Sequence, residues 1–286
     1  MDHEVLDSAS AGTRAVDRRR WRTGSRDRRT RGAGRAVTET RVFDDAEALA
    51  RHAARWLCAL AQRSSGRLAV SLSGGSTPRR LYELLAQADV PWDRVHWFWG
   101  DERFVPPGHA DSNYRMASEA LLMHAPVPSA NIHAIPTEGL SPEDAALEYE
   151  RTLQRFYGAE RLVRERPLFD VTLLGLGEDG HIASLFPGHA ALEEERRWVL
   201  PVQGARKEAR ITLTYPALES SRETAFLVTG AVKKDALARA QAGDGTIPAG
   251  RLRPLGSVHW FIDRAAAGIV AHLTGDRHES FPQDHA

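Results

Sequence analysis

The chain has 286 residues, 42% of them hydrophobic, and its 38 basic and 38 acidic side chains give a formal net charge of zero at pH 7. This length can bury a full-sized core within one domain. A neutral chain is atypical of proteins that bind nucleic acid through a broad basic surface. The single cysteine, Cys58, excludes an internal disulfide, and no apolar stretch reaches the length of a membrane span. We therefore expect a cytoplasmic protein with small-molecule partners, no nucleic-acid partner and no membrane partner.

The first 36 residues differ in composition from the rest of the chain. The segment 13–35 is dense in arginine and has almost no periodic apolar positions, which is typical of a solvated extension. A basic arm that contacts nucleic acid or an acidic surface is the alternative interpretation. We expect three parts: a disordered extension over 1–36, a single α/β domain over 37–275 and a short tail over 276–286.

From residue 47 onward, helical segments alternate with short β-branched or aromatic runs. The first predicted helix spans 47–62, where Leu49, Ala53 and Leu57 recur at helical spacing. Strands are then predicted at 67–72, 95–100, 169–177, 224–230 and 257–263, and helices at 78–88, 114–122 and 232–240. Strands that each lead into a helix indicate βαβ units. The sequence predicts an α/β fold with a doubly wound, mostly parallel sheet and helices on both faces, and ligands in such folds bind beyond the carboxyl ends of the strands.

The first strand leads directly into SGGSTP at 73–78. Thr77 is predicted to cap the following helix, with Pro78 in its first turn. Backbone N–H groups at such a helix start, beside glycines that admit a close ligand, favour an anion such as phosphate. An ordinary strand-to-helix turn has the same appearance, and the loop lacks the Gly-x-x-x-x-Gly-Lys pattern of a Walker loop.

Charged side chains follow the next strand abruptly at Asp101, Glu102 and Arg103. A carboxylate and a guanidinium at the end of a strand can handle a proton and an anion, respectively. Arg210 and Lys233 are two further candidate cations. Each of these charges could equally belong to an ordinary solvated surface.

The segment 175–180 has the Gly-x-Gly-x-x-Gly spacing of a dinucleotide-binding fingerprint. Pro-Gly at 187–188 stops any long helix, and the region 196–204, where a ribose-binding carboxylate is expected, holds none. We therefore expect no nucleotide here. The glycines instead predict a tight turn that presents Asp179 and His181 beyond a buried strand.

His181 is a candidate general base. A neutral histidine can take a proton from water, and a neighbouring carboxylate such as Asp179 can orient its ring. A loop histidine beside an aspartate is also common as a purely structural pair. The sequence contains no His-Glu-x-x-His, no cysteine set and no Gly-x-Ser-x-Gly elbow, so it predicts neither a metal site nor a serine nucleophile.

Taken together, these stretches resemble the 6-phosphogluconolactonase family. The resemblance is carried by SLSGGSTP at 71–78, GDERFVP at 100–106, DSNY at 111–114, GLGEDGHIASLFPG at 175–188, RITLTYPAL at 210–218 and a Gly-x-x-Lys turn at 230–233. It implies the family's Rossmann-like α/β fold, which uses no nucleotide.

The resemblance also implies an activity: hydrolysis of 6-phospho-D-glucono-1,5-lactone to 6-phosphogluconate, the second step of the oxidative pentose phosphate pathway, without metal or organic cofactor. His181 would activate water, supported by Asp179. Asp101 and Arg103 would line the lactone end, where Arg103 could steady the carbonyl oxygen of the tetrahedral intermediate. The substrate phosphate would be held by Gly74, Gly75, Ser76, Thr77, Arg210 and Lys233. Such an enzyme would be a monomer or a homodimer.

One departure from the family pattern is Ile182, where many lactonases have threonine and the related deaminases more often have isoleucine. The SLFPG segment at 184–188 and Arg103 point back to a lactonase. Two alternatives remain: a hexosamine-phosphate isomerase/deaminase, and a non-catalytic sugar-phosphate-sensing domain. The second would normally need a helix-turn-helix before residue 40, and none can be read there.

Overall fold

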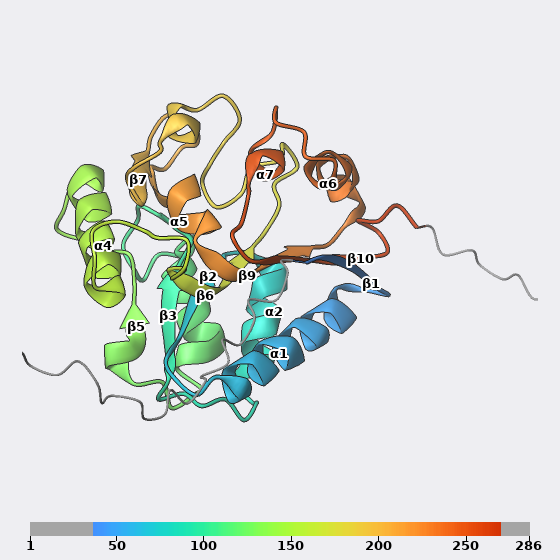
Figure 1. Ribbon diagram of the computed structural model, residues 1–286, viewed down its shortest axis with the longest axis horizontal. Coiled ribbons are helices and arrows are strands. Elements are labelled where there is room, and N and C mark those ends of the chain that lie inside the picture. The colour runs from blue at the N-terminus through green and yellow to red at the C-terminus, as the bar shows by residue number, and fades with distance from the viewer. Residues whose placement is uncertain (1–36, 270–286) are drawn as a thin grey trace, which may run out of the picture. The chain divides into compact units, whose positions relative to one another are not determined.

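The computed structural model describes residues 37–269, so the predicted extension over 1–36 and the tail over 276–286 lie outside the described residues. Its main sheet has seven strands, all parallel, in the order β1-β10-β9-β6-β2-β3-β5 (Figure 1). The strands of this sheet are β1 (Thr38–Phe43), β2 (Leu68–Leu72), β3 (Val95–Trp99), β5 (Ile132–His133), β6 (Phe169–Leu174), β9 (Ser221–Val228) and β10 (Ser257–Asp263). The predicted parallel sheet is confirmed.

Helices cover both faces of this sheet, as expected. In Figure 1, α1 and α2 lie on one side of the strands β1, β10 and β9, and α6 and α7 lie on the other side. The helices are α1 (Ala46–Arg63), α2 (Ser76–Leu85), α3 (Asn113–Ala117), α4 (Pro142–Tyr157), α5 (Tyr215–Glu219), α6 (Lys234–Gln241) and α7 (Pro248–Arg251), with a π-helical turn at Ser118–Leu122 and 3₁₀ turns at Ser129–Asn131, Ala190–Glu193 and Ala231–Lys233. Within residues 37–269, no helix is both long enough and apolar enough to cross a membrane.

The central strands are buried on both faces, which explains their sequences. Every residue of β2 is buried, including Ser71, and the run from Ala225 to Val228 in β9 is buried throughout. A strand covered on both sides gains from apolar residues at every position rather than at alternate ones. The continuous apolar runs that predicted these strands therefore reflect their place in the middle of the sheet.

A second, smaller sheet was not predicted. It has three antiparallel strands in the order β4-β8-β7, which are β4 (Asp101–Arg103), β8 (Arg210–Leu213) and β7 (Val199–Val202). Gly100 connects the two sheets, since its N–H donates to Leu72 O at 2.9 Å and its carbonyl accepts from Leu213 N at 2.9 Å. The smaller sheet thus begins where β3 ends and places β4 and β8 beyond the carboxyl edge of the main sheet.

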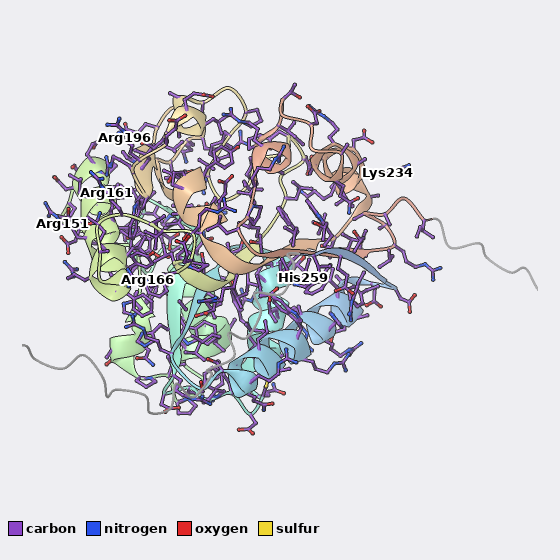
Figure 2. The ribbon with its side chains drawn as sticks, viewed as in Figure 1. Arg151, Arg161, Arg166, Arg196, Lys234 and His259 are labelled. Carbon is purple, nitrogen blue, oxygen red and sulfur yellow. The ribbon has the colours of Figure 1, made fainter. Side chains whose placement is uncertain are left out.

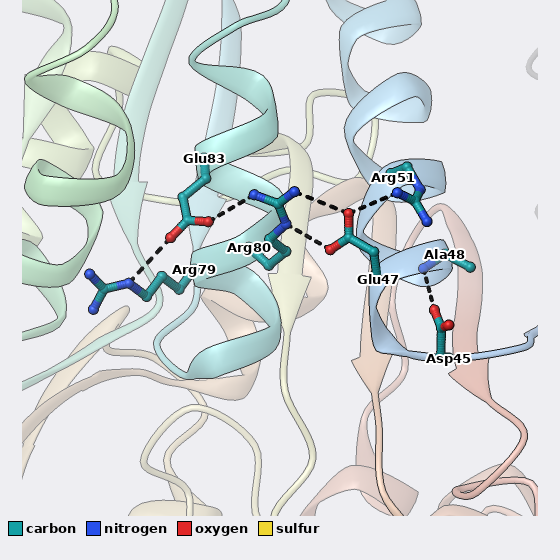
Figure 3. A network of polar contacts seen from close by, with 7 residues as sticks. All are labelled: Asp45, Glu47, Ala48, Arg51, Arg79, Arg80 and Glu83. Carbon is teal, nitrogen blue, oxygen red and sulfur yellow. Dashed lines mark hydrogen bonds and ion pairs between the residues drawn. The ribbon is translucent and has the colours of Figure 1, made fainter.

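Polar contacts tie α1 to α2 (Figure 3). Asp45 caps α1 by accepting a hydrogen bond from Ala48 N at 2.7 Å. The Glu47 carboxylate accepts hydrogen bonds from Arg80 of α2 at 2.7 and 3.0 Å and from Arg51 at 3.0 Å. Exposed ion pairs contribute little stability, but a two-pronged pair of this kind fixes the position of one helix against the other.

The start of α2 differs from the prediction. The helix begins at Ser76, after Gly75 at the N-cap with φ 113°, and no side chain caps it. The prediction that Thr77 is the cap is wrong, because its hydroxyl pairs with the Thr229 hydroxyl at 2.8 Å. This contact joins the first turn of α2 to the loop after β9.

Candidate active site

A cavity of about 320 Å³ lies where the loops after β2, β6 and β9 meet the small sheet. These three strands are neighbours in the main sheet, so their carboxyl ends open to the same place. Most of the predicted site residues line the cavity: Gly74, Gly75, Asp101, Arg103, His181, Arg210 and Lys233. Ser76 and Thr77 stand in the first turn of α2 and do not line it.

His181 lines the cavity and is hydrogen-bonded to Asp179, which does not line it. His181 Nδ1 lies 2.5 Å from Asp179 Oδ1, which also accepts the His181 backbone N–H at 3.1 Å. Burial raises the pKa of the Asp179 carboxyl, but hydrogen bonds from His181 and Arg206 outweigh burial and hold that pKa below its ordinary value. An ionised Asp179 accepts a hydrogen bond from the Nδ1–H group, which leaves Nε2 of His181 as the nitrogen with a free lone pair.

The glycines of this loop make room for the pair. A Cβ on Gly177 would lie 2.0 Å from His181 Nδ1 and 2.7 Å from Asp179 Oδ1. Gly180 has φ 82°, and a Cβ there would meet the Ile247 side chain at 2.7 Å. No helix opens between 175 and 189. The Gly-x-Gly-x-x-Gly spacing therefore serves the histidine and differs from a dinucleotide-binding turn.

Arg103 and Arg210 face each other across the small sheet. They are directly paired residues of the antiparallel strands β4 and β8, and both line the cavity. The Nε atom of each is buried and has no hydrogen-bond partner among the described residues. Burial and the charge of Arg103 lower the pKa of the Arg210 guanidinium. Like charges directly opposite each other destabilise a sheet, and a bound anion would relieve that repulsion.

The Asp101 side chain is held in place by a hydrogen bond from the loop that carries His181. Its Oδ2 accepts a hydrogen bond from Ser184 Oγ at 2.6 Å, and both residues are buried and line the cavity. The preceding Ala183 has φ 46°, a backbone conformation that residues with a Cβ rarely adopt. Such local strain is most often retained at functional sites.

Glu102 joins β4 to the segment that follows it. Its carboxylate accepts hydrogen bonds from Arg103 N, Asn113 N and Tyr114 N, each at 2.7 Å, and from Ser112 Oγ at 3.1 Å. Burial raises the pKa of this carboxyl, and the three backbone donors partly offset that effect. Glu102 therefore links the GDER and DSNY motifs, because its carboxylate accepts hydrogen bonds from the backbone N–H groups at the start of α3.

Asn113 is the part of this arrangement that reaches the cavity. Its Nδ2 donates to Asp101 O at 2.9 Å, and a Cβ on Gly74 would lie 2.0 Å from its Oδ1. Gly74 is thus required for close packing of the loop after β2 against Asn113.

Replacing Glu102 with glutamine should lower the free energy of unfolding by about 1–3 kcal/mol, because an amide NH₂ group would face a backbone N–H donor. Denaturant-induced unfolding followed by fluorescence measures this change. The exposed Glu160 provides the control, and Glu160→Gln should leave the midpoint unchanged. Equal midpoints for the two variants would contradict the role given to Glu102.

Lys233 reaches the cavity from the turn after β9. Asp263, at the end of β10, holds this turn by accepting the Gly230 N–H with both carboxylate oxygens at 3.1 Å. The neighbouring Lys234, labelled in Figure 2, begins α6. Its side chain lies beside Gly268. Of the two adjacent lysines, Lys233 is therefore the one placed to meet a ligand.

Several residues of the cavity wall were not predicted as site residues, among them Asn113, Ser184, Phe186 and Arg206. The first three lie within motifs that were recognised as stretches, so each could have been named. Arg206 lies in no motif, and only the fold brings it to this place. Among residues 37–269, no group of three or more His, Cys, Asp and Glu side chains is arranged to hold a metal ion.

Comparison with known proteins identifies the family. The family described as glucosamine-6-phosphate isomerases/6-phosphogluconolactonase matches residues 44–260. The chain is 43% identical over 212 residues to a 6-phosphogluconolactonase of Nostoc sp., an alignment that covers 73% of this chain and 87% of that protein. It is 39% identical over 215 residues to "6-phosphogluconolactonase 3, chloroplastic" of Arabidopsis thaliana, with 72% of this chain and 66% of the relative covered.

Among solved structures, the fold is similar to that of 6-phosphogluconolactonase from Trypanosoma cruzi, with a TM-score of 0.72, 30% identity, and 82% of this chain and 97% of the other covered. Sequence and structure thus agree over most of the chain, and the cavity formed by its loops lies within the matched region. The chain belongs to the 6-phosphogluconolactonase family, within the wider group that also contains the glucosamine-6-phosphate isomerases.

Proposed function

We propose that this protein hydrolyses 6-phospho-D-glucono-1,5-lactone to 6-phospho-D-gluconate, the second step of the oxidative pentose phosphate pathway, and that His181 activates the attacking water. The observation that carries this proposal is the pairing of His181 with Asp179 in a cavity that also contains the facing cations Arg103 and Arg210. One base and nearby positive charge are what water attack on a sugar-phosphate lactone requires.

The reaction proceeds in two steps. Nε2 of His181 takes a proton from water as the water oxygen bonds to the lactone carbonyl carbon, and negative charge develops on the carbonyl oxygen. The tetrahedral intermediate then collapses, the bond from this carbon to the ring oxygen breaks, and the leaving oxygen takes the proton back from His181. Asp179 stabilises the charged imidazole between the two steps and holds its tautomer.

The positive side chains divide between the two ends of the substrate. Arg210, Lys233 and the glycine loop at Gly74 and Gly75 hold the phosphate, with Ser76 and Thr77 contributing through the start of α2. Arg103, next to Arg210, steadies the carbonyl oxygen as it gains charge, beside Asp101. No metal or organic cofactor takes part in this scheme.

This division predicts different kinetics for the two arginines. Arg210→Ala should raise KM by about 10- to 100-fold, the effect of losing one charge-assisted contact, with a smaller change in kcat. Arg103→Ala should mainly lower kcat. Steady-state hydrolysis rates of both variants test this. A rise in KM alone for both would place both arginines at the phosphate, and an unchanged KM for Arg210→Ala would remove it from the site.

The same family also contains sugar-phosphate isomerases, so the second candidate is a hexosamine-phosphate isomerase/deaminase. Ile182, the residue that favours it, is fully buried, and we assign it to packing rather than to substrate contact. Two assays run in parallel discriminate: lactone hydrolysis in excess chelator and ammonia release from glucosamine 6-phosphate. We expect fast, chelator-resistant lactone hydrolysis and no ammonia. Ammonia release would instead favour the hexosamine-phosphate isomerase/deaminase. No activity in either assay would favour a sugar-phosphate-sensing domain.

We place the protein in the cytoplasm as a monomer or homodimer, with a sugar-phosphate lactone as its partner and neither nucleic acid nor membrane. The single cysteine supports an environment without disulfides. Cell fractionation and analytical ultracentrifugation test location and oligomeric state.

A further inference from the structure

Arg206 is the cavity residue to which the reaction above gives no role. It lies on the segment between β7 and β8, which has no motif and no regular structure, and it lines the cavity. Its neighbour Lys207 is 93% exposed and pairs only with Glu208, at 3.6 Å. The segment therefore turns one cation toward the site and one toward solvent.

The contacts of Arg206 are with the histidine–aspartate pair. Its Nη2 donates to Asp179 Oδ2 at 3.1 Å, while the other oxygen of that carboxylate is taken by His181. Its guanidinium carbon lies 4.5 Å from the centre of the Phe186 ring, and this ring lies 4.8 Å from the His181 ring. Arg206 thus contacts both supports of the histidine, the carboxylate and the aromatic ring.

A carboxylate held at one oxygen only can rotate about its last side-chain bond. The Asp179 side chain is 40% exposed, so water competes for its second oxygen. With Arg206 bound to Oδ2, rotation would break a charge-assisted hydrogen bond, and Oδ1 stays directed at Nδ1. The planar guanidinium also stacks on Phe186, which limits its own freedom.

We propose that Arg206 is a positioning residue for His181: it fixes Asp179, and through it the tautomer and orientation of the base. The inference rests on the proposed hydrolysis. It concerns kcat and the acid limb of the pH profile rather than substrate affinity.

The charged groups at and near the cavity come from several elements. They are Asp179 and Glu178 on the loop of His181, Arg206 on the β7–β8 segment, Asp101 and Arg103 on β4, Arg210 on β8 and Lys233 after β9. Of the cations, Arg206 is the one hydrogen-bonded to the histidine's carboxylate partner. Its removal takes away one of the contacts that hold the pKa of the Asp179 carboxyl below its ordinary value, so that this carboxyl would be protonated at higher pH.

The test compares Arg206→Gln, Arg206→Lys and the control Lys207→Gln in the full chain. For Arg206→Gln we expect a kcat about tenfold lower than that of wild type and a KM within about twofold of it. We also expect the acid limb of its kcat/KM profile to move to higher pH by roughly 0.5–1 unit. Arg206→Lys keeps the positive charge but loses the planar guanidinium group. The acid limb of its kcat/KM profile should therefore match that of wild type, while kcat recovers only in part. Lys207→Gln should match wild type throughout.

A second readout needs no substrate. The NMR titration midpoint of the Asp179 side-chain carboxyl in the free protein should move to higher pH in Arg206→Gln and stay in place in Lys207→Gln. A raised KM with unchanged kcat and unchanged titration would overturn the proposal and make Arg206 a substrate contact. If wild type has no lactonase activity but the titration shift between wild type and Arg206→Gln is observed, the proposed function is wrong and the positioning role of Arg206 is still supported.

Discussion

His181→Gln is expected to lower kcat for lactone hydrolysis by about 100- to 10,000-fold, the range typical of a lost general base. Glutamine is close to histidine in size and can hydrogen-bond, but it cannot accept a proton at neutral pH. KM should change little, because in this account the phosphate is held by Arg210, Lys233 and the glycine loop.

The spontaneous hydrolysis of the lactone must be subtracted at each pH, since it sets the lower limit of the measurement. The exposed His124 provides a control, and His124→Gln should keep wild-type kinetics. Unchanged circular dichroism would show that His181→Gln is folded. A folded His181→Gln that retains more than a tenth of the wild-type kcat would remove His181 as the base.

The second large effect is expected for Gly177→Ala. Its Cβ would lie 2.0 Å from His181 Nδ1 and 2.3 Å from Cε1 of the same ring, so the imidazole must leave its present position. Because displacement breaks the hydrogen bond to Asp179, we expect a loss of kcat of about 100-fold or more with little loss of stability.

Gly175→Ala is the matched variant two residues earlier in the same loop. A Cβ there would meet only Ser73 Oγ, at 3.8 Å, which is an ordinary contact. Kinetics and thermal unfolding of the two variants should therefore differ sharply in kcat and little in melting temperature. Similar kcat values for the two variants would contradict the close approach at Gly177.

Much of this site can be predicted from the amino-acid sequence. The continuous apolar runs in β2, β6 and β9 predict buried parallel strands. In a parallel sheet the loops that follow the strands lie at one edge, which predicts that the site lies beyond the carboxyl ends of these strands. The glycines and the Asp179–His181 spacing then predict a tight turn that exposes a histidine. These inferences succeed because they depend on residues close together in sequence.

The features that were missed depend on residues far apart. The three residues of β4 are charged and too few to give a strand pattern, so the small sheet and the direct pairing of Arg103 with Arg210 could not be read from the sequence. Thr77 has the chemistry of a helix cap, but Thr229, which follows another strand, takes its hydroxyl. Arg206 reaches Asp179 only because the chain folds its segment across the cavity.

The most direct test of the account is the enzymatic rate, above the spontaneous reaction, with 6-phosphoglucono-1,5-lactone and with unphosphorylated glucono-1,5-lactone side by side. We predict rapid hydrolysis of the phosphorylated lactone and a kcat/KM at least about 100-fold lower for the unphosphorylated one, because we assign several cations to the phosphate. Equal values for the two lactones would contradict the phosphate site. No acceleration of either would contradict the proposed function itself.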